Sequence, residues 1–278
     1  GASLLSSGAD TPSAVATLRN GLDSRGLALL VRRLGAEHAW SLGQWAREHC
    51  PEAVTVYSAT ALLQSIRRGG ARGGGEQAVR RAEDVCLRWL GEGCPADLHT
   101  WTALVAVYAE HGEWEAAEEA VFRSMPAAGL EPNAHAFSAL IAACRRGGAW
   151  PRAAYAFQVM VAAGVAPDAV AYNSLIGAYA EGGEWVRAAR AFRAMQAEGL
   201  RPTVVTYNSL IAALGAGGRW ADAVQAFADM EAAGLSPDVV TANSLITALG
   251  RSGRWRLALE LLGSLEGRGV TPGGGADG

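Results

Sequence analysis

The apolar and polar positions of this chain follow a helical period that glycine pairs interrupt at regular intervals. In residues 204–238, the apolar side chains of Tyr207, Leu210, Ile211 and Leu214 recur at spacings of three and four. That spacing places them on one face of an α-helix. The pattern therefore predicts an amphipathic helix, for which Thr206 is a suitable N-cap. The helix is expected to end at the pair Gly217 and Gly218.

A second helix is predicted directly after this glycine pair. Its apolar face is formed by Trp220, Val224, Phe227 and Met230. Gly234 follows this run, and glycine readily adopts the left-handed conformation that ends many helices. Pro237 comes soon afterwards and disfavours continuation of the helix. Residues 204–238 are therefore predicted to form a helix-turn-helix pair.

This pair recurs along the chain, and tryptophans mark its period. Five of them, at positions 114, 150, 185, 220 and 255, are separated by 36, 35, 35 and 35 residues. A fixed period of this size is typical of solenoid proteins, because one helical pair cannot bury its apolar face without a stacked neighbour. The expected fold is all-α, a right-handed α-solenoid of stacked helix-turn-helix repeats.

Alignment of the glycine turns and tryptophans gives one array with two flanking segments. The predicted copies are residues 56–97, 98–133, 134–168, 169–203, 204–238 and 239–273. Residues 21–55 form a shorter, degenerate helical pair, with Trp40 in the place of the repeat tryptophan, and are expected to cap the array. Residues 1–20 are predicted to be a flexible N-terminal segment and residues 274–278 a tail.

The first copy is longer than the others. It spans 42 residues, and the surplus lies in the arginine- and glycine-rich stretch 67–81. Such a composition is typical of flexible segments that do not pack. This stretch is therefore predicted to be a solvated loop.

The charge of the chain limits the chemistry it can perform. All 24 basic residues are arginine, against 27 acidic residues, and the net charge is -3. The lack of lysine excludes a lysine Schiff base and the lysine of a phosphate-binding loop. Domains that bind the phosphate backbone of a duplex by charge are strongly basic, whereas this chain is weakly acidic. A nucleic-acid site must therefore be a local part of its surface.

The cysteines and the apolar runs indicate neither a disulfide scaffold nor a membrane span. Four cysteines, Cys50, Cys86, Cys94 and Cys144, lack disulfide-scaffold or C-x-x-C spacing and are expected to be packed, reduced thiols. No stretch approaches the roughly 18 uninterrupted apolar residues that a membrane span needs. The first twenty residues contain one arginine, Arg19, and no apolar signal core, as expected for a mature or trimmed chain.

Four sequence elements in residues 204–238 resemble a known family. VVTYNSLI, GGRW, AFADM and AAGLSPD follow one another in the order typical of the P-type pentatricopeptide repeat of plant and green-algal organellar RNA-binding proteins. The resemblance covers about residues 56–273. The related tetratricopeptide repeat, with its W-x2-L-G-x2-Y signature, is not found. The resemblance implies a chloroplast or mitochondrial protein that binds single-stranded RNA at one nucleotide per repeat, alongside other organellar RNA-processing proteins and without a cofactor.

In this family, the fifth and last residues of each repeat select the base. Carried over to this chain, the pairs are Thr60 with Asp97, Thr102 with Asn133, Ser138 with Asp168, Asn173 with Thr203, and Asn208 with Asp238. The family's pairing preferences imply G, A, G, a pyrimidine and U, a 5′-GAGYU core. The sixth pair is Asn243 with Gly273, and no base is assigned to it because glycine has no side chain.

The resemblance also implies residues that stack on the base and residues that meet phosphate. The second-position residues, which sandwich the base, are Tyr57, His99, His135, Val170, Val205 and Val240. The two histidines depart from the usual aliphatic residue, although imidazole can stack on a base. The phosphate-contacting residues near the end of the first helix are Arg68, Arg146 and Arg251, with Glu110, Glu181 and Ala216 in that place in the other copies.

Other functions remain open at this stage. His111-Gly112-Glu113 matches half of the zinc deaminase signature, but the P-C-x-x-C half is missing and the three residues occupy a turn position. We therefore expect no metal site and no enzymatic activity in this chain. One alternative is a protein-interaction or ribosome-associated helical scaffold, which the acidic residues Glu110 and Glu181 favour. Another is a specificity module of an enzyme whose catalytic domain lies beyond Gly278.

Overall fold

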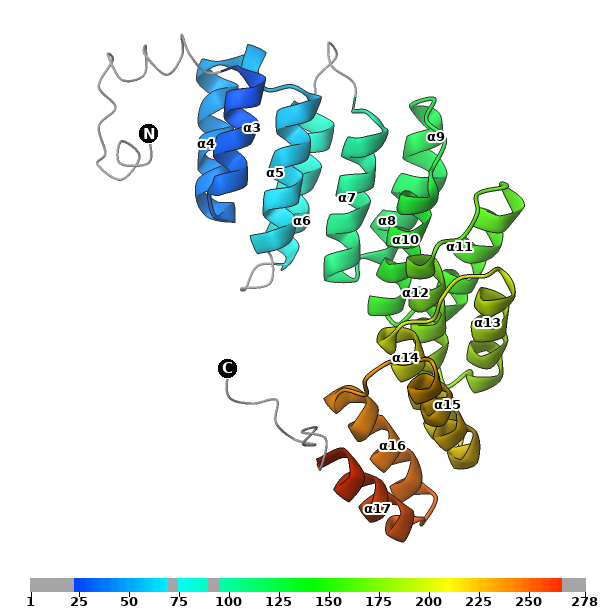
Figure 1. The fold of residues 1–278 in the computed structure, drawn as a ribbon. Coiled ribbons are helices and arrows are strands. Elements are labelled where there is room, and N and C mark those ends of the chain that lie inside the picture. Colours follow the sequence, from blue (N-terminus) through cyan, green and yellow to red (C-terminus); the bar gives the residue numbers. More distant parts are fainter. Residues whose placement is uncertain (1–22, 70–74, 90–95, 267–278) are drawn as a thin grey trace. The chain divides into compact units, whose positions relative to one another are not determined.

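The computed structural model describes residues 23–69, 75–89 and 96–266, and every regular element within these ranges is a helix (Figure 1). The predicted N-terminal segment 1–20, the tail 274–278 and Gly273 lie outside the described residues. The chain divides into two compact units, residues 1–111 with 115–132, and residues 112–114 with 133–278. The predicted all-α class and the packing of helical pairs on one another are confirmed for the described residues.

The helices of the first unit follow one another as packed pairs. They are α3 (Ser24–Arg33), α4 (Ala36–His49), the 3-10 turn η1 (Pro51–Ala53), α5 (Val56–Gly69), α6 (Gly75–Glu83), the π-helical turn η3 (Asp84–Trp89) and α7 (Leu98–His111). A helical run then comprises α8 (Trp114–Glu119), the π-helical turn η4 (Ala120–Ser124) and α9 (Met125–Ala127). α3 packs against both α4 and α5, and α5 packs against α7.

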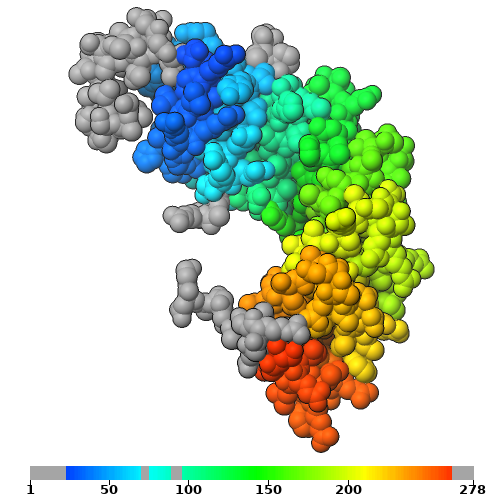
Figure 2. Space-filling view, viewed as in Figure 1, coloured from blue at the N-terminus to red at the C-terminus, as the bar shows by residue number. Residues whose placement is uncertain are grey.

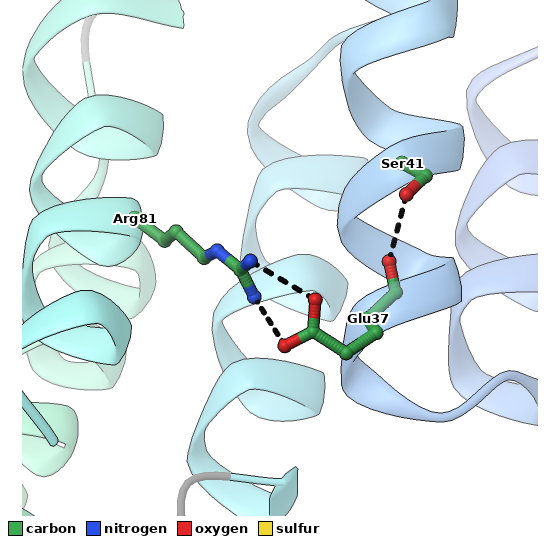
Figure 3. Close-up of polar contacts among 3 residues, drawn as sticks. All are labelled: Glu37, Ser41 and Arg81. Atoms are coloured by element: carbon green, nitrogen blue, oxygen red, sulfur yellow. Dashed lines mark hydrogen bonds and ion pairs between the residues drawn. The ribbon is translucent and has the colours of Figure 1, made fainter. Parts of the chain in front are cut away.

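The predicted loop at residues 67–81 is largely helical. Residues 67–69 complete α5 and residues 75–81 belong to α6, while residues 70–74 lie outside the described residues. α6 is held in place because Ala78 and Ala82 are buried, and because Arg81 donates two hydrogen bonds to the Glu37 carboxylate, at 2.8 and 3.0 Å (Figure 3). The loop prediction was wrong because composition alone does not reveal these packing partners.

The degenerate first pair also differs from the prediction in one detail. Trp40 is the fifth residue of α4, whereas the repeat tryptophans in the second unit are the first residues of their helices. The reason is that α4 begins directly after Gly35, so its first turn precedes Trp40. The Trp40 ring is covered by the Arg81 guanidinium, 5.3 Å from the ring centroid. Trp40 therefore has a partner on α6.

The second unit contains the regular part of the array. Its helices are α10 (Ala134–Arg146), α11 (Trp150–Ala162), α12 (Ala169–Glu181), α13 (Trp185–Ala197), α14 (Val204–Ala216), α15 (Trp220–Ala232), α16 (Val239–Arg251) and α17 (Trp255–Glu266). The first helices α10, α12, α14 and α16 pack against one another in that order, and each packs against its own second helix. Figure 2 shows these repeats in direct surface contact in chain order, from green through yellow to red.

Glycines and one threonine fix the helix ends in residues 204–238. Gly218 in the turn after α14 has a φ of 69°, and Gly234 after α15 has a φ of 76°. The Leu235 N–H donates to the Met230 carbonyl, which completes the C-terminal motif predicted at Gly234. The N-cap prediction was wrong: Thr203, in an extended conformation, caps α14, and Thr206 lies in the first turn as its capping-box partner.

The core of the second unit lies between the first and second helices of each pair. Isoleucines of α10, α12 and α14 and methionines near the ends of α11, α13 and α15 are fully buried; they are Ile141, Ile176, Ile211, Met160, Met195 and Met230. The Phe192 ring meets the Tyr207 ring of the next repeat edge-on, with 5.2 Å between centroids. Each repeat therefore buries apolar surface against its neighbour.

The repeat tryptophans join consecutive repeats instead of filling the core. Trp185 is half-buried, and its ring lies directly against Gly217 of the next repeat. The Arg219 guanidinium covers the same ring at 5.2 Å from the centroid. The arrangement recurs with Trp150, Gly182 and Arg187, and with Trp114, Gly147 and Arg152. We call each such trio a tryptophan clasp.

Three of the four cysteines lie within the described residues. Cys50, Cys86 and Cys144 are buried thiols that form no disulfide among the described residues, as predicted, and Cys94 lies outside the described part. Burial raises the pKa of the Cys86 thiol to about 12, which keeps it protonated at neutral pH. Among the helices that the structure describes, none has the length and apolar character needed to cross a bilayer.

Candidate nucleic-acid interface

The last residue of a repeat caps the first helix of the next one. Asp168 accepts a hydrogen bond from the Ala171 N–H at 2.7 Å, Asp238 from the Thr241 N–H at 2.8 Å. Asn133 does the same for α10 through the Ala136 N–H, at 2.9 Å. Asp and Asn suit this role because their short side chains accept from the unpaired N–H groups at a helix start. Capping therefore fixes where these side chains lie.

Two predicted base-reading pairs of the second unit are brought into direct contact. The Ser138 hydroxyl donates to Oδ1 of Asp168 at 3.0 Å, and Nδ2 of Asn208 donates to Oδ1 of Asp238 at 3.0 Å. In both pairs, the fifth residue of one repeat meets the residue that caps the next repeat. Each pair is therefore a single polar group at the N-terminal turns of two adjacent first helices.

The other pairs of the second unit are arranged differently. Oδ1 of Asn173 accepts from the Thr206 hydroxyl at 2.5 Å, and in the described part of the chain no hydrogen bond joins Asn173 to Thr203. Asn243 is exposed near the start of α16, and its predicted partner Gly273 lies outside the described residues. The sequence analysis assigned Thr206 as an N-cap and did not predict its contact with Asn173, although a threonine three residues after Thr203 fits a capping box.

In the first unit, a third-position threonine again lies between the predicted partners. Thr100 bonds to Oδ1 of Asp97 through both its N–H and its hydroxyl, each at 2.8 Å. Its hydroxyl also lies 3.2 Å from that of Thr60. Thr60 and Asp97 are therefore linked through Thr100. The Thr102 hydroxyl donates to the Leu98 carbonyl at 2.6 Å; its predicted partner Asn133 belongs to the other unit, so their pairing stays a prediction.

The charge of the Asp238 carboxylate is set by its partners. Burial raises its pKa, but hydrogen bonds from Thr241, Asn208 and Val240 lower it by more, so the pKa lies below the ordinary value. Asp238 is therefore ionised at neutral pH. The side-chain bonds from Thr241 and Asn208 both use Oδ1, so the three side chains form one hydrogen-bonded group.

Beside these polar pairs, the second-position residues expose apolar surface. Val170, Val205 and Val240 are 58%, 55% and 57% exposed, and Tyr57 is 46% exposed. His99 and His135, at the same position in their repeats, are also exposed. Each lies in the first turn of a first helix, three residues before the predicted fifth-position base-reading residue of its repeat. An isolated exposed valine is ordinary, but an exposed valine, histidine or tyrosine recurs at this position in all six repeats, which favours a shared role.

The predicted phosphate-contacting arginines lie at the opposite ends of the first helices. Arg68, Arg146 and Arg251 are exposed in the last turns of α5, α10 and α16. Glu181, at the equivalent place in α12, is ion-paired with Arg145 at 2.9 Å. The sequence analysis missed Arg145. Its signal is Gly177, whose missing side chain makes room for the Arg145 guanidinium.

The partial deaminase motif forms an ordinary turn. His111 ends α7, Trp114 begins α8, and Gly112 between them has a φ of 73°, like the turn glycines of the other repeats. Across residues 23–69, 75–89 and 96–266, no group of three or more His, Cys, Asp or Glu side chains is placed to hold a metal ion.

Comparison with known proteins identifies similar sequences and structures. A pentatricopeptide repeat domain model matches residues 91–146 and 156–217, and models of the PPR repeat family match residues 202–251 and 240–270. The curated protein sequences give no match. Among solved structures, PPR10 in complex with an 18-nt psaJ RNA element is 26% identical, with a TM-score of 0.66 over 97% of this chain. PPR10 is a maize protein.

A second solved structure is more distant. Nuclear proteinaceous RNase P 2 (PRORP2) from A. thaliana is 17% identical, with a TM-score of 0.52 over 59% of this chain and 37% of its own, and shows the fold alone. This chain spans 42% of the length of PPR10. The repeat-model matches lie within the array and together cover more than half of the chain. This chain belongs to the pentatricopeptide repeat family.

Proposed function

We propose that this chain binds single-stranded RNA in a sequence-specific way, at one nucleotide per repeat. The observation that carries the proposal is the pairing of a polar group with an exposed valine, as in Asn208, Asp238 and Val205. The polar pair offers hydrogen bonds to a base edge, and the valine offers an apolar surface for the base face. The similarity to PPR10 in complex with RNA supports the same function.

The proposed target is an RNA that contains 5′-GAGYU, read by the pairs from Thr60 with Asp97 to Asn208 with Asp238. We further propose that the protein acts in a chloroplast or mitochondrion, together with other organellar RNA-processing proteins. Its mechanism is occupancy: the bound RNA is masked from nucleases, held open or presented to other factors. Recognition of this kind needs no chemistry from the repeat array.

One argument for the alternative function, a protein-interaction or ribosome-associated scaffold, is weakened by an ion pair. It depended on the acidic residues Glu110 and Glu181 and on the net charge of -3, and Glu181 is ion-paired with Arg145. An unpaired exposed carboxylate repels a phosphate group, whereas the positive charge of a paired arginine offsets much of that repulsion. The ion pair with Arg145 therefore reduces the repulsion that Glu181 would exert on an RNA phosphate.

Replacement of Val205 by glutamate is expected to weaken binding to an RNA containing GAGUU by about tenfold, because the lost base contact is worth roughly 1 to 3 kcal/mol. Fluorescence anisotropy with a labelled strand measures this change. Val186→Glu is the matched control, since Val186 is also an exposed second residue of a helix, but on α13. Its dissociation constant is expected to stay within about twofold of wild type. Equal losses in both variants would count against the proposed face.

A further inference from the structure

Threonines at the third position contact the base-reading residue of the preceding repeat. The Thr206 hydroxyl donates to Oδ1 of Asn173 at 2.5 Å, and the Thr241 hydroxyl donates to Oδ1 of Asn208 at 2.6 Å. Both threonines are fully buried. Each threonine lies on the first helix of the repeat that follows its asparagine, and neither threonine is one of the predicted base-reading residues.

The two asparagines differ in how many groups hold them. Asn208 is held at both ends of its amide, because Oδ1 accepts from Thr241 and Nδ2 donates to Asp238. For Asn173, the one side-chain bond in the described structure is that from Thr206 to Oδ1. Since a hydroxyl donates a single proton and an amide has distinct donor and acceptor ends, this bond decides which end of Asn173 faces away from Thr206.

The repeats without such a threonine need no orienting group. Alanine stands at the third position as Ala136 and Ala171, and the fifth residues that precede them are the hydroxyl residues Thr102 and Ser138. A hydroxyl rotates to suit its partner, whereas an amide presents a donor or an acceptor according to its orientation. The asparagines Asn173 and Asn208 are each followed by a third-position threonine, and Thr100 likewise follows the hydroxyl residue Thr60.

We infer that Thr206 is a specificity-determining positioning residue, whose hydroxyl fixes the Asn173 amide so that Nδ2 is presented to the fourth base. The inference rests on the proposed function. A fixed N–H donor matches the O2 acceptor that cytosine and uracil share, which agrees with the pyrimidine proposed at this site. Thr241 acts on Asn208 less strictly, because its hydroxyl proton is shared between Asn208 and Asp238, and Asp238 itself holds the Asn208 amide.

The test is a set of binding measurements with four RNAs that differ only at the fourth base of the core. We expect wild type to favour a pyrimidine there. In Thr206→Val, the ratio of purine to pyrimidine dissociation constants is expected to fall by about threefold to tenfold, while selectivity at the third and fifth bases stays unchanged. Thr206→Ser keeps the hydroxyl, so its ratio of purine to pyrimidine dissociation constants is expected to match that of wild type. In Thr241→Val, the loss of selectivity at the fifth base is expected to be smaller than the loss at the fourth base in Thr206→Val, because Asp238 still holds Asn208.

The outcomes separate the inference from the proposed function. If wild type selects a pyrimidine and Thr206→Val does so equally well, or loses selectivity at all bases alike, the inference is overturned and RNA binding stands. If wild type binds no single-stranded RNA, the proposed function fails, and the inferred role with it. Thr206→Ala is a second variant should valine disturb folding, because alanine occupies this position in two other repeats.

A measurement without RNA checks the positioning itself. The side-chain amide resonances of Asn173 are expected to shift in Thr206→Val, because Oδ1 loses its donor. Thr247→Val is the control, since the Thr247 hydroxyl donates to a carbonyl of its own helix. Unchanged Asn173 resonances in Thr206→Val would overturn the inference.

Discussion

Replacement of Gly217 by alanine is expected to lower the free energy of unfolding of the second unit by about 1 to 3 kcal/mol, the usual cost of overpacking. The new Cβ would overlap Cδ1 and Cγ of Trp185, which lie directly against Gly217. The backbone does not explain such a loss, because Gly217 has a φ of -79°, which alanine adopts freely. Urea denaturation followed by far-UV circular dichroism measures the change.

Two controls assign this loss to the tryptophan clasp. Gly250→Ala places a methyl group in open space on α16 and is expected to be neutral or stabilising, by up to about 1 kcal/mol. In a Trp185→Ala background, Gly217→Ala is expected to cost little, because the obstructing ring has been removed. If Gly217→Ala destabilises both backgrounds equally, the ring is not the cause.

Asn133→Asp is expected to move the preference at the second RNA base from A to G, with a change in discrimination of about 1 to 3 kcal/mol. An amide N–H can donate to N1 of adenine, whereas a carboxylate only accepts, and guanine offers donors at N1 and N2. Helix capping is preserved, because aspartate caps as well as asparagine and already does so at Asp168 and Asp238. Selection from a randomised RNA pool measures the preference.

The same selection contains its own control. The third base, assigned to Ser138 and Asp168, is expected to remain G in the variant. An unchanged preference at the second base, with RNA binding intact, would contradict the proposed register. A change of preference at another base would instead show that each repeat reads a different nucleotide from the one assigned to it.

The fold was largely predictable because the repeat imposes the same constraints many times. The apolar spacing in residues 204–238 located both helices, and Gly234 marked the end of the second one. The N-cap was placed on Thr206 instead of Thr203 because capping depends on backbone conformation. The stretch 67–81 was taken for a loop because the ion pair of Arg81 with Glu37 joins residues 44 apart in the sequence.

The candidate site was predictable only as a set of positions. The resemblance to the family pairs Asn173 with Thr203. In the structure, Asn173 is instead bonded to Thr206, which lies in the first turn of α14, three residues after Thr203. The sequence likewise does not reveal that Glu181 is ion-paired with Arg145 of the preceding repeat. Both partners come from an adjacent repeat, and contacts between repeats depend on side-chain directions that sequence spacing does not specify.

The most direct test of RNA recognition is the binding of this chain to a short single strand containing GAGUU. Fluorescence anisotropy compares that strand with a scrambled strand and with the duplex, all near 0.1 M salt because the strength of phosphate contacts depends on the salt concentration. We expect tight binding to the GAGUU single strand, much weaker binding to the scrambled strand and little binding to the duplex. Comparable weak binding to all three would contradict sequence-specific recognition by these repeats.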